Sequence, residues 1–200
     1  MPPSIQDERP SDDRSDQPDR PGHNRLAWLA LAYKVPSEPS RKRVHVWRRV
    51  KELGAIYLQQ AVCLLPESQA ASEQFRALAR EIRELDGEAV LVRLEFLEAG
   101  EEEKMIGEFR RARDQEYAEV MEQARRLLEE LEMETDRRNF TFAEVEENEE
   151  DLAKLQRWLR KVKERDYFGG ALQDRAKDLL QRCDAAMQEF TQKVFEENTR

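Results

Sequence analysis

Residues 26–66 read LAWLALAYKVPSEPSRKRVHVWRRVKELGAIYLQQAVCLLP, and the succession of element types in this stretch decides the fold. Residues 26–35 are apolar and aromatic, which is typical of a buried strand. Two prolines then end the strand, and a helix is predicted over residues 40–53, with Gly54 as its C-terminal stop. Residues 55–65 are strand-like again, either as one bent strand or as two short strands broken near residues 59–60.

The helix over residues 40–53 is expected to have an apolar face and a basic face. Ser40 is a suitable N-cap, and Ser37 followed by Pro39 near the first helical position is the alternative. The spacing places four side chains on the apolar face: Val46, Trp47, Val50 and Leu53.

A second helix and a further strand follow residues 55–65. Ser68 can cap the helix, Gly87 ends it, and residues 89–97 have the composition of a strand. If residues 55–65 form a hairpin, the element order is β-α-β-β-α-β. This order is that of a ferredoxin-like sheet with both helices on one face, so we predict an α+β fold with a ferredoxin-like domain at residues 25–99.

The flanking segments have different compositions. Residues 1–24 are rich in Pro, Ser, Asp and Arg, and we expect a disordered tail because they cannot bury enough apolar surface to offset ordering. Residues 100–200 are predicted to be a helical region of about three helices. The first covers residues 101–133, and the second begins at a capping box formed by Thr141 and Glu144. Residues 169–170 separate the second helix from the last one.

Composition excludes several classes of protein. No apolar run reaches the roughly 18 residues that a membrane span needs, so we expect a cytoplasmic protein without membrane contact. Cys63 and Cys183 have no metal-ligand spacing and are expected to be buried thiols. No nucleotide-binding or hydrolase motif occurs, and the two histidines, His23 and His45, offer little to acid–base catalysis. We therefore expect no enzyme, no cofactor and no bound metal.

The charge is distributed unevenly along the chain. The net charge is −9, yet residues 25–66 carry eight basic and two acidic residues. A helix start that follows a strand end favours an oxyanion, because free N–H groups and arginine forks can bind its oxygens. Trp47 would support this site by stacking with Arg43. The alternative is a solvated basic face that pairs with the acidic helical half. The candidate residues for binding an oxyanion or DNA are Lys34, Ser40, Arg41, Lys42, Arg43, Arg48 and Arg49.

A run of acidic residues between Glu144 and Asp151 also has two interpretations. Its carboxylates could bind a divalent cation. The alternative is a solvated face near a helix N-terminus, where the helix dipole favours negative charge.

Three blocks of the sequence resemble a known family. They are YKVPSEPSRKRVHVWRRVKELGAIYLQQAVCLLP (33–66), FTFAEVEENEEDLAKLQRWL (140–159) and RDYFGG (165–170). Over residues 25–200 the chain resembles the N-terminal domain of ChrB, the chromate-resistance regulatory family. The resemblance implies chromate-responsive control of a chromate-efflux operon through DNA binding. Longer members add a C-terminal domain, so we expect this chain to be a short form without it.

Three functions follow as hypotheses. The first is a transcriptional regulator whose partners are promoter DNA and the chromate oxyanion. The second is an interaction module whose helical half forms a homodimer. The third is a metal-dependent nuclease assembled at a dimer interface, against which stands the lack of any acidic residue in the strand over residues 26–35.

Overall fold

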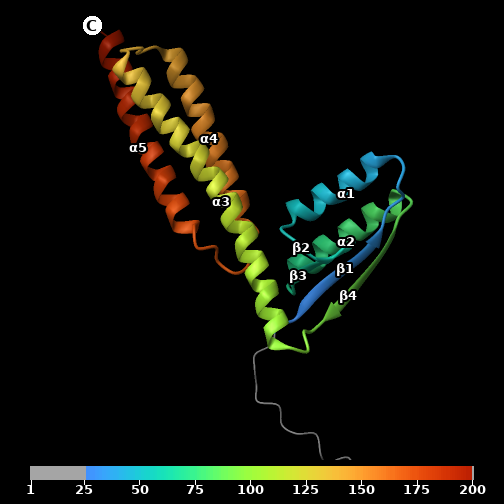
Figure 1. Cartoon of the computed structure of the whole chain (residues 1–200). Coiled ribbons are helices and arrows are strands. Elements are labelled where there is room, and N and C mark those ends of the chain that lie inside the picture. Colours follow the sequence, from blue (N-terminus) through green and yellow to red (C-terminus); the bar gives the residue numbers. More distant parts are fainter. Residues whose placement is uncertain (1–25, 200) are drawn as a thin grey trace, which may run out of the picture.

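The computed structural model describes residues 26–199, so the tail predicted for residues 1–24 lies outside the described residues. Figure 1 shows a V-shaped molecule in which a sheet-containing half and an arm of three helices diverge from a common base. A four-stranded antiparallel sheet and five helices confirm the predicted α+β class.

The sheet half contains the elements of the first hundred residues. Along the chain these are β1 (Trp28–Lys34), α1 (Ser40–Glu52), β2 (Ile56–Gln59), β3 (Val62–Pro66), α2 (Gln69–Glu84) and β4 (Glu88–Leu94). The arm consists of α3 (Ala99–Asp136), α4 (Phe142–Glu164) and α5 (Gln173–Asn198). Residues 55–65 thus divide into two short strands, which is one of the two predicted alternatives.

The strands lie in the order β2-β3-β1-β4, and every neighbouring pair is antiparallel. Side chains alternate between the two faces of a strand, so Trp28 and Ala30 share one face while Leu29 and Leu31 share the other. Val92 pairs with Ala30 and therefore lies on the Trp28 face. The strands β2 and β4 form the two edges of this sheet.

The first hydrophobic core joins the sheet to α1, α2 and the first turns of α3. Phe75, Leu78 and Ile82 of α2 are fully buried in it. Trp28 is also fully buried, and its ring lies 5.8 Å from the ring of Phe109 on α3. Because each such aromatic ring removes a large apolar area from water, this contact fixes the base of α3 to the sheet.

The second core lies inside the helical arm. An apolar stripe on each of α3, α4 and α5 packs against the other two, as expected for helices that cannot hide such stripes alone. The stripe of α3 contributes to the first core through Met105 and Phe109 and to the second from Tyr117 onward. One continuous helix therefore belongs to both halves of the molecule.

The structure tests several predicted details of the first helix. Gly54 has φ +71°, as a helix-ending glycine should. The prediction of Ser40 as N-cap is wrong, because Pro39 occupies that position without a side-chain hydrogen bond and Ser40 is the first helical residue. The prediction that Trp47 shares the buried face is also wrong, since its side chain is 46% exposed. Each helical residue turns by about 100°, so Trp47 points well away from its buried neighbour Val46.

The predictions for two further helix N-caps and for the cysteines are confirmed. The Ser68 side chain accepts a hydrogen bond from the Ala71 N–H at 3.0 Å, and the Thr141 side chain accepts one from the Glu144 N–H at 3.3 Å. The reciprocal bond of the predicted capping box is not formed, because the Thr141 N–H donates to the Asn139 carbonyl at 3.0 Å. Cys63 and Cys183 are buried free thiols. No helix in residues 26–199 is long and apolar enough to cross a membrane.

Candidate functional site

The side of α1 that faces α2 is closed by ion pairs. Arg49 donates from Nε to Glu81 at 3.0 Å, and Lys42 donates to Asp86 at 2.8 Å. His45 lies 3.4 Å from the same Glu81 carboxylate. The hydrogen bond from Arg49 lowers the pKa of Glu81, and His45 adds to that effect. Two of the predicted binding residues, Lys42 and Arg49, are thus engaged in attaching α1 to α2.

Three arginines of α1 are exposed, and among residues 26–199 none of them has an ion-pair partner: Arg41, Arg43 and Arg48. At about 100° per residue, Arg41 and Arg48 share the outer side of the helix, whereas Arg43 lies about 160° around it. The structure places the other predicted residues elsewhere. Lys34 is exposed at the end of β1, and Ser40 begins the helix. Ser40 and Arg48 are eight residues apart on the helix, or about 12 Å along its axis, so the predicted set forms a strip rather than one compact pocket.

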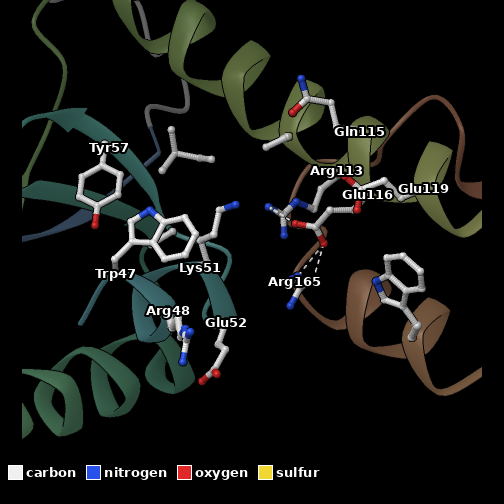
Figure 2. Close-up of a pocket in the computed structure, with 14 residues that line it drawn as sticks. Trp47, Arg48, Lys51, Glu52, Tyr57, Arg113, Gln115, Glu116, Glu119 and Arg165 are labelled. Carbon is white, nitrogen blue, oxygen red and sulfur yellow. Dashed lines mark hydrogen bonds and ion pairs between the residues drawn. The ribbon is translucent and has the colours of Figure 1, made fainter. Parts of the chain in front are cut away.

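A cleft with a volume of about 510 Å³ lies between α1 and the helical arm. Residues of α1 and β2 form one wall, and residues of α3, α4 and the segment after α4 form the other. Figure 2 shows Lys51 and Arg113 extending into it from opposite sides. We call this space the interarm cleft. Its charged and aromatic lining includes Trp47, Lys51, Arg113, Glu116, Trp158 and Arg165.

Trp47 and Lys51 form one wall of the interarm cleft. The Lys51 ammonium lies 4.7 Å from the centre of the Trp47 ring, a cation–π contact one helical turn apart. The predicted stacking partner of Trp47 was Arg43, whereas the structure places Lys51 over the ring. No carboxylate within the described residues pairs with Lys51. The cation is therefore held in position by an aromatic face and not neutralised.

Arg113 is the most buried charged residue of the opposite wall. The residue is 4% exposed, and its Nη2 lies 3.1 Å from a Glu116 oxygen. Glu116 also accepts from Arg165, at 2.9 Å from Nε, so one carboxylate serves two guanidinium groups. Nε and Nη1 of Arg113 are buried without a hydrogen-bond partner in the described structure. Burial lowers the pKa of Arg113, which is the direction expected for a desolvated cation.

The RDYFGG segment (165–170) joins the two halves behind the cleft. The Tyr167 hydroxyl donates to the Leu53 carbonyl at the end of α1, at 3.0 Å, and the Phe168 ring lies 5.7 Å from that of Trp28. Asp166 accepts hydrogen bonds from Tyr117 and from the Gly170 N–H. The segment thus contacts the end of α1, β1 and α3 at once.

Sequence reasoning missed the contributions of Lys51, Arg113, Trp158 and Arg165. Arg113 did leave a signal, because it stands between Phe109 and Tyr117 on the buried stripe of α3. A basic residue at an apolar stripe position indicates a buried charge with a specific partner. Lys51 and Arg165 left no comparable signal, since their neighbours in space come from distant segments.

The acidic run does not form a cation site. In residues 26–199, no group of three or more His, Cys, Asp or Glu side chains could hold a metal ion. Glu144 instead accepts a hydrogen bond from Asn139 at 3.1 Å, next to the helix N-terminus. The cysteines are also remote from surface chemistry, because burial raises the pKa of Cys63 to about 12 and raises that of Cys183.

Comparisons with known proteins give one family. The family described as "Protein ChrB, N-terminal" matches residues 43–200. A curated relative, Protein ChrB of Cupriavidus metallidurans, is 30% identical over 101 residues, which are 50% of this chain and 31% of that protein. The match thus covers about a third of the relative's length. No solved structure matches.

Proposed function

The chain belongs to the family of the ChrB N-terminal region, and from that premise we propose that it is a chromate-responsive regulatory protein that binds the promoter of a chromate-resistance operon. The observation that carries this proposal is the exposed basic strip on the outer side of α1. There Arg41 and Arg48 lack ion-pair partners among the described residues. Unpaired arginines on a rigid helix are suited to contact phosphate oxygens in pairs.

The ion pairs on the α2 side support the same role. Lys42 and Arg49 fix α1 to α2 through Asp86 and Glu81, so the outward arginines stand on a rigid support. Positioned side chains lose less conformational entropy on binding than mobile ones. The net charge of −9 restricts DNA contact to this local strip, because the remainder of the chain is acidic and repels phosphate.

The proposal predicts a loss of DNA binding when two outer arginines are removed. A mobility-shift titration with the operon's promoter compares the natural chain with a variant carrying Arg41→Ala and Arg48→Ala. Because each lost phosphate contact lowers the salt slope by about one, the double variant should reduce the slope by about two. Arg157→Ala, an exposed arginine on α4, is the matched control and should bind as the natural chain does.

Chromate is the second variable of this experiment. We propose that the oxyanion binds the cations of the same strip and competes with phosphate. Added chromate should therefore release the promoter fragment, whereas an equal concentration of chloride should release less. Promoter binding that is unchanged in the double variant and in chromate would contradict the proposal.

A second candidate role, homodimerisation, is favoured by the edge strand β4. Val90 and Val92 are 58% and 45% exposed although they belong to a strand. In a symmetric antiparallel pairing centred on Leu91, Val90 of one copy would lie opposite Val92 of the other. Size measurement in solution tests this role, and a Val92→Lys variant should remain monomeric at concentrations where the natural chain pairs.

The remaining parts of the proposal concern architecture and mode of action. We propose that residues 25–99 form a ferredoxin-like domain, supported by the β-α-β-β-α-β order and the strand order β2-β3-β1-β4. The helical region from residue 100 is the second unit of this division. We further propose that the protein acts in the cytoplasm and by binding rather than by catalysis.

A further inference from the structure

We propose that the interarm cleft binds a small anion that carries a flat ring. This inference goes beyond DNA and chromate binding, because it concerns a ligand of different shape and a cleft that shares only Arg48 with the basic strip of α1. It rests on the lining of the cleft alone and does not depend on the proposed regulatory role.

The anionic part of the ligand follows from the charges in the cleft. Lys51 and Arg113 extend toward each other from opposite walls, as Figure 2 shows, and like charges that converge favour an anion between them. The lining carboxylates do not balance the lining cations, because Arg48, Lys51, Arg113 and Arg165 stand against Glu52, Glu116 and Glu119. Glu52 is bound by Arg49 and Glu116 is shared by two arginines, whereas Glu119 is exposed and has no ion pair within residues 26–199.

Arg113 strengthens this argument because it is buried. A guanidinium that is 4% exposed is costly unless a negative charge lies nearby. Its share of the Glu116 carboxylate is partial, and Asp166 acts on it electrostatically without a hydrogen bond. The positive potential of Arg113 therefore adds to that of Lys51 within the cleft that both residues line.

The ring follows from the aromatic lining and the size of the cleft. Trp47 of α1 and Trp158 of α4 line the cleft from its two walls. A volume of about 510 Å³ is within the range of small-molecule sites and far exceeds a single tetrahedral oxyanion. A flat ring can stack on an indole, and such stacking is favourable by about 1–3 kcal/mol for a nucleic-acid base. A ligand that combines ring and anion uses both features at once.

Calorimetric titration of the full chain tests the ligand class with four probes. Adenosine monophosphate and benzoate each combine a ring with an anion, the first as phosphate and the second as carboxylate. Ribose 5-phosphate has the anion alone, and adenosine has the ring alone. We expect saturable binding, with a dissociation constant below about 1 mM, for at least one of the two ring-bearing anions. That ligand should bind at least about tenfold more tightly than the probe lacking its ring or its charge.

Variants then locate the binding. Lys51→Met should weaken binding of the ring-bearing anion about tenfold, and Trp158→Leu should weaken it by a similar factor. Lys104→Met, an exposed lysine near the start of α3 and outside the cleft lining, is the control and should leave the affinity unchanged. Circular dichroism verifies that each variant is folded.

Two outcomes would overturn the inference. One is the absence of saturable binding by both adenosine monophosphate and benzoate. The other is binding that is equal in the natural chain, Lys51→Met and Trp158→Leu. Neither outcome bears on promoter binding, which is measured without these probes and in a double variant that leaves Lys51 and Trp158 unchanged.

Discussion

Helix α1 has two sides that contact different neighbours, and the comparison between them explains what each can do. On the α2 side, Arg49 and Lys42 meet carboxylates at 3.0 Å and 2.8 Å. On the α3 side, Lys51 meets an aromatic ring and faces another cation, Arg113. On the α2 side the cations are neutralised by carboxylates of the protein itself, whereas on the α3 side positive charge is left without a neutralising partner. The same helix thus combines a structural interface with a binding surface.

The base of α3 is attached to β1 and to the 165–170 segment, not to α1, by aromatic rings, and breaking this attachment should have the largest effect on stability. Phe109 is 1% exposed, and its ring contacts those of Trp28, Tyr167 and Phe168. Phe109→Ala should lower the free energy of unfolding by about 3–5 kcal/mol, as expected for a buried phenylalanine. Chemical denaturation measures the change. Phe142→Ala, which removes a half-exposed ring at the far end of the arm, should cost much less.

The attachment on the α2 side is ionic, so a smaller effect is expected there. Arg49→Met should lower the free energy of unfolding by about 0.5–1 kcal/mol, because the pairs with Glu81 and Glu52 are partly exposed and screened by solvent. Added salt should reduce this difference, whereas it should not reduce the effect of Phe109→Ala. A salt-independent difference would indicate that Arg49 acts through packing.

The same ion pair predicts a pH dependence. Arg49 holds the pKa of the Glu81 carboxyl below its ordinary value of about 4.3. The ionised carboxylate therefore stabilises the folded state above that value, and the contribution is lost as the pH falls through the lowered folded-state pKa. The difference in unfolding free energy between the natural chain and Glu81→Gln should accordingly be present at pH 6 and shrink below about pH 4. An unchanged difference at low pH would contradict this.

The smallest effect is expected on the unpaired side. Lys51 has no carboxylate partner in the described part of the chain, so Lys51→Met should change the free energy of unfolding by about 0.5 kcal/mol or less. Arg49 and Lys51 are two residues apart on one helix, so the stability effects of Arg49→Met and Lys51→Met compare the two sides of α1 directly. A large loss with Lys51→Met would mean that the cleft side is as structural as the α2 side.

Much of the fold was predictable because local signals agreed with tertiary packing. Gly54, Ser68 and Thr141 end or begin helices as their conformational preferences require. The position of Trp47 was predicted wrongly because helical periodicity allows a wide apolar face. In the folded protein only one edge of that face on α1, the edge with Val46 and Val50, is buried.

The candidate site was predictable only in part. The basic segment was visible in the sequence, yet sequence could not divide it into paired and unpaired cations. That division depends on Asp86 and Glu81, which lie more than thirty residues further along the chain. The opposite wall was harder to predict from sequence. Arg113 and Arg165 are 52 residues apart in the chain, and they lie close together because both bind Glu116.

The 38 residues of α3 form an unbroken helix about 57 Å long, with the sheet attached at one end and α4 and α5 attached along the rest. Such an element behaves as a lever whose pivot is the Trp28–Phe109 contact. The tip at Asp136 lies about 40 Å from Phe109, so a rotation of roughly 5° at this pivot would move the tip by about 3.5 Å while changing the cleft near the pivot much less. A small adjustment around Lys51 and Arg113 would thus be amplified at the distal end of the arm, which gives a pair of spectroscopic labels there the largest displacement to report.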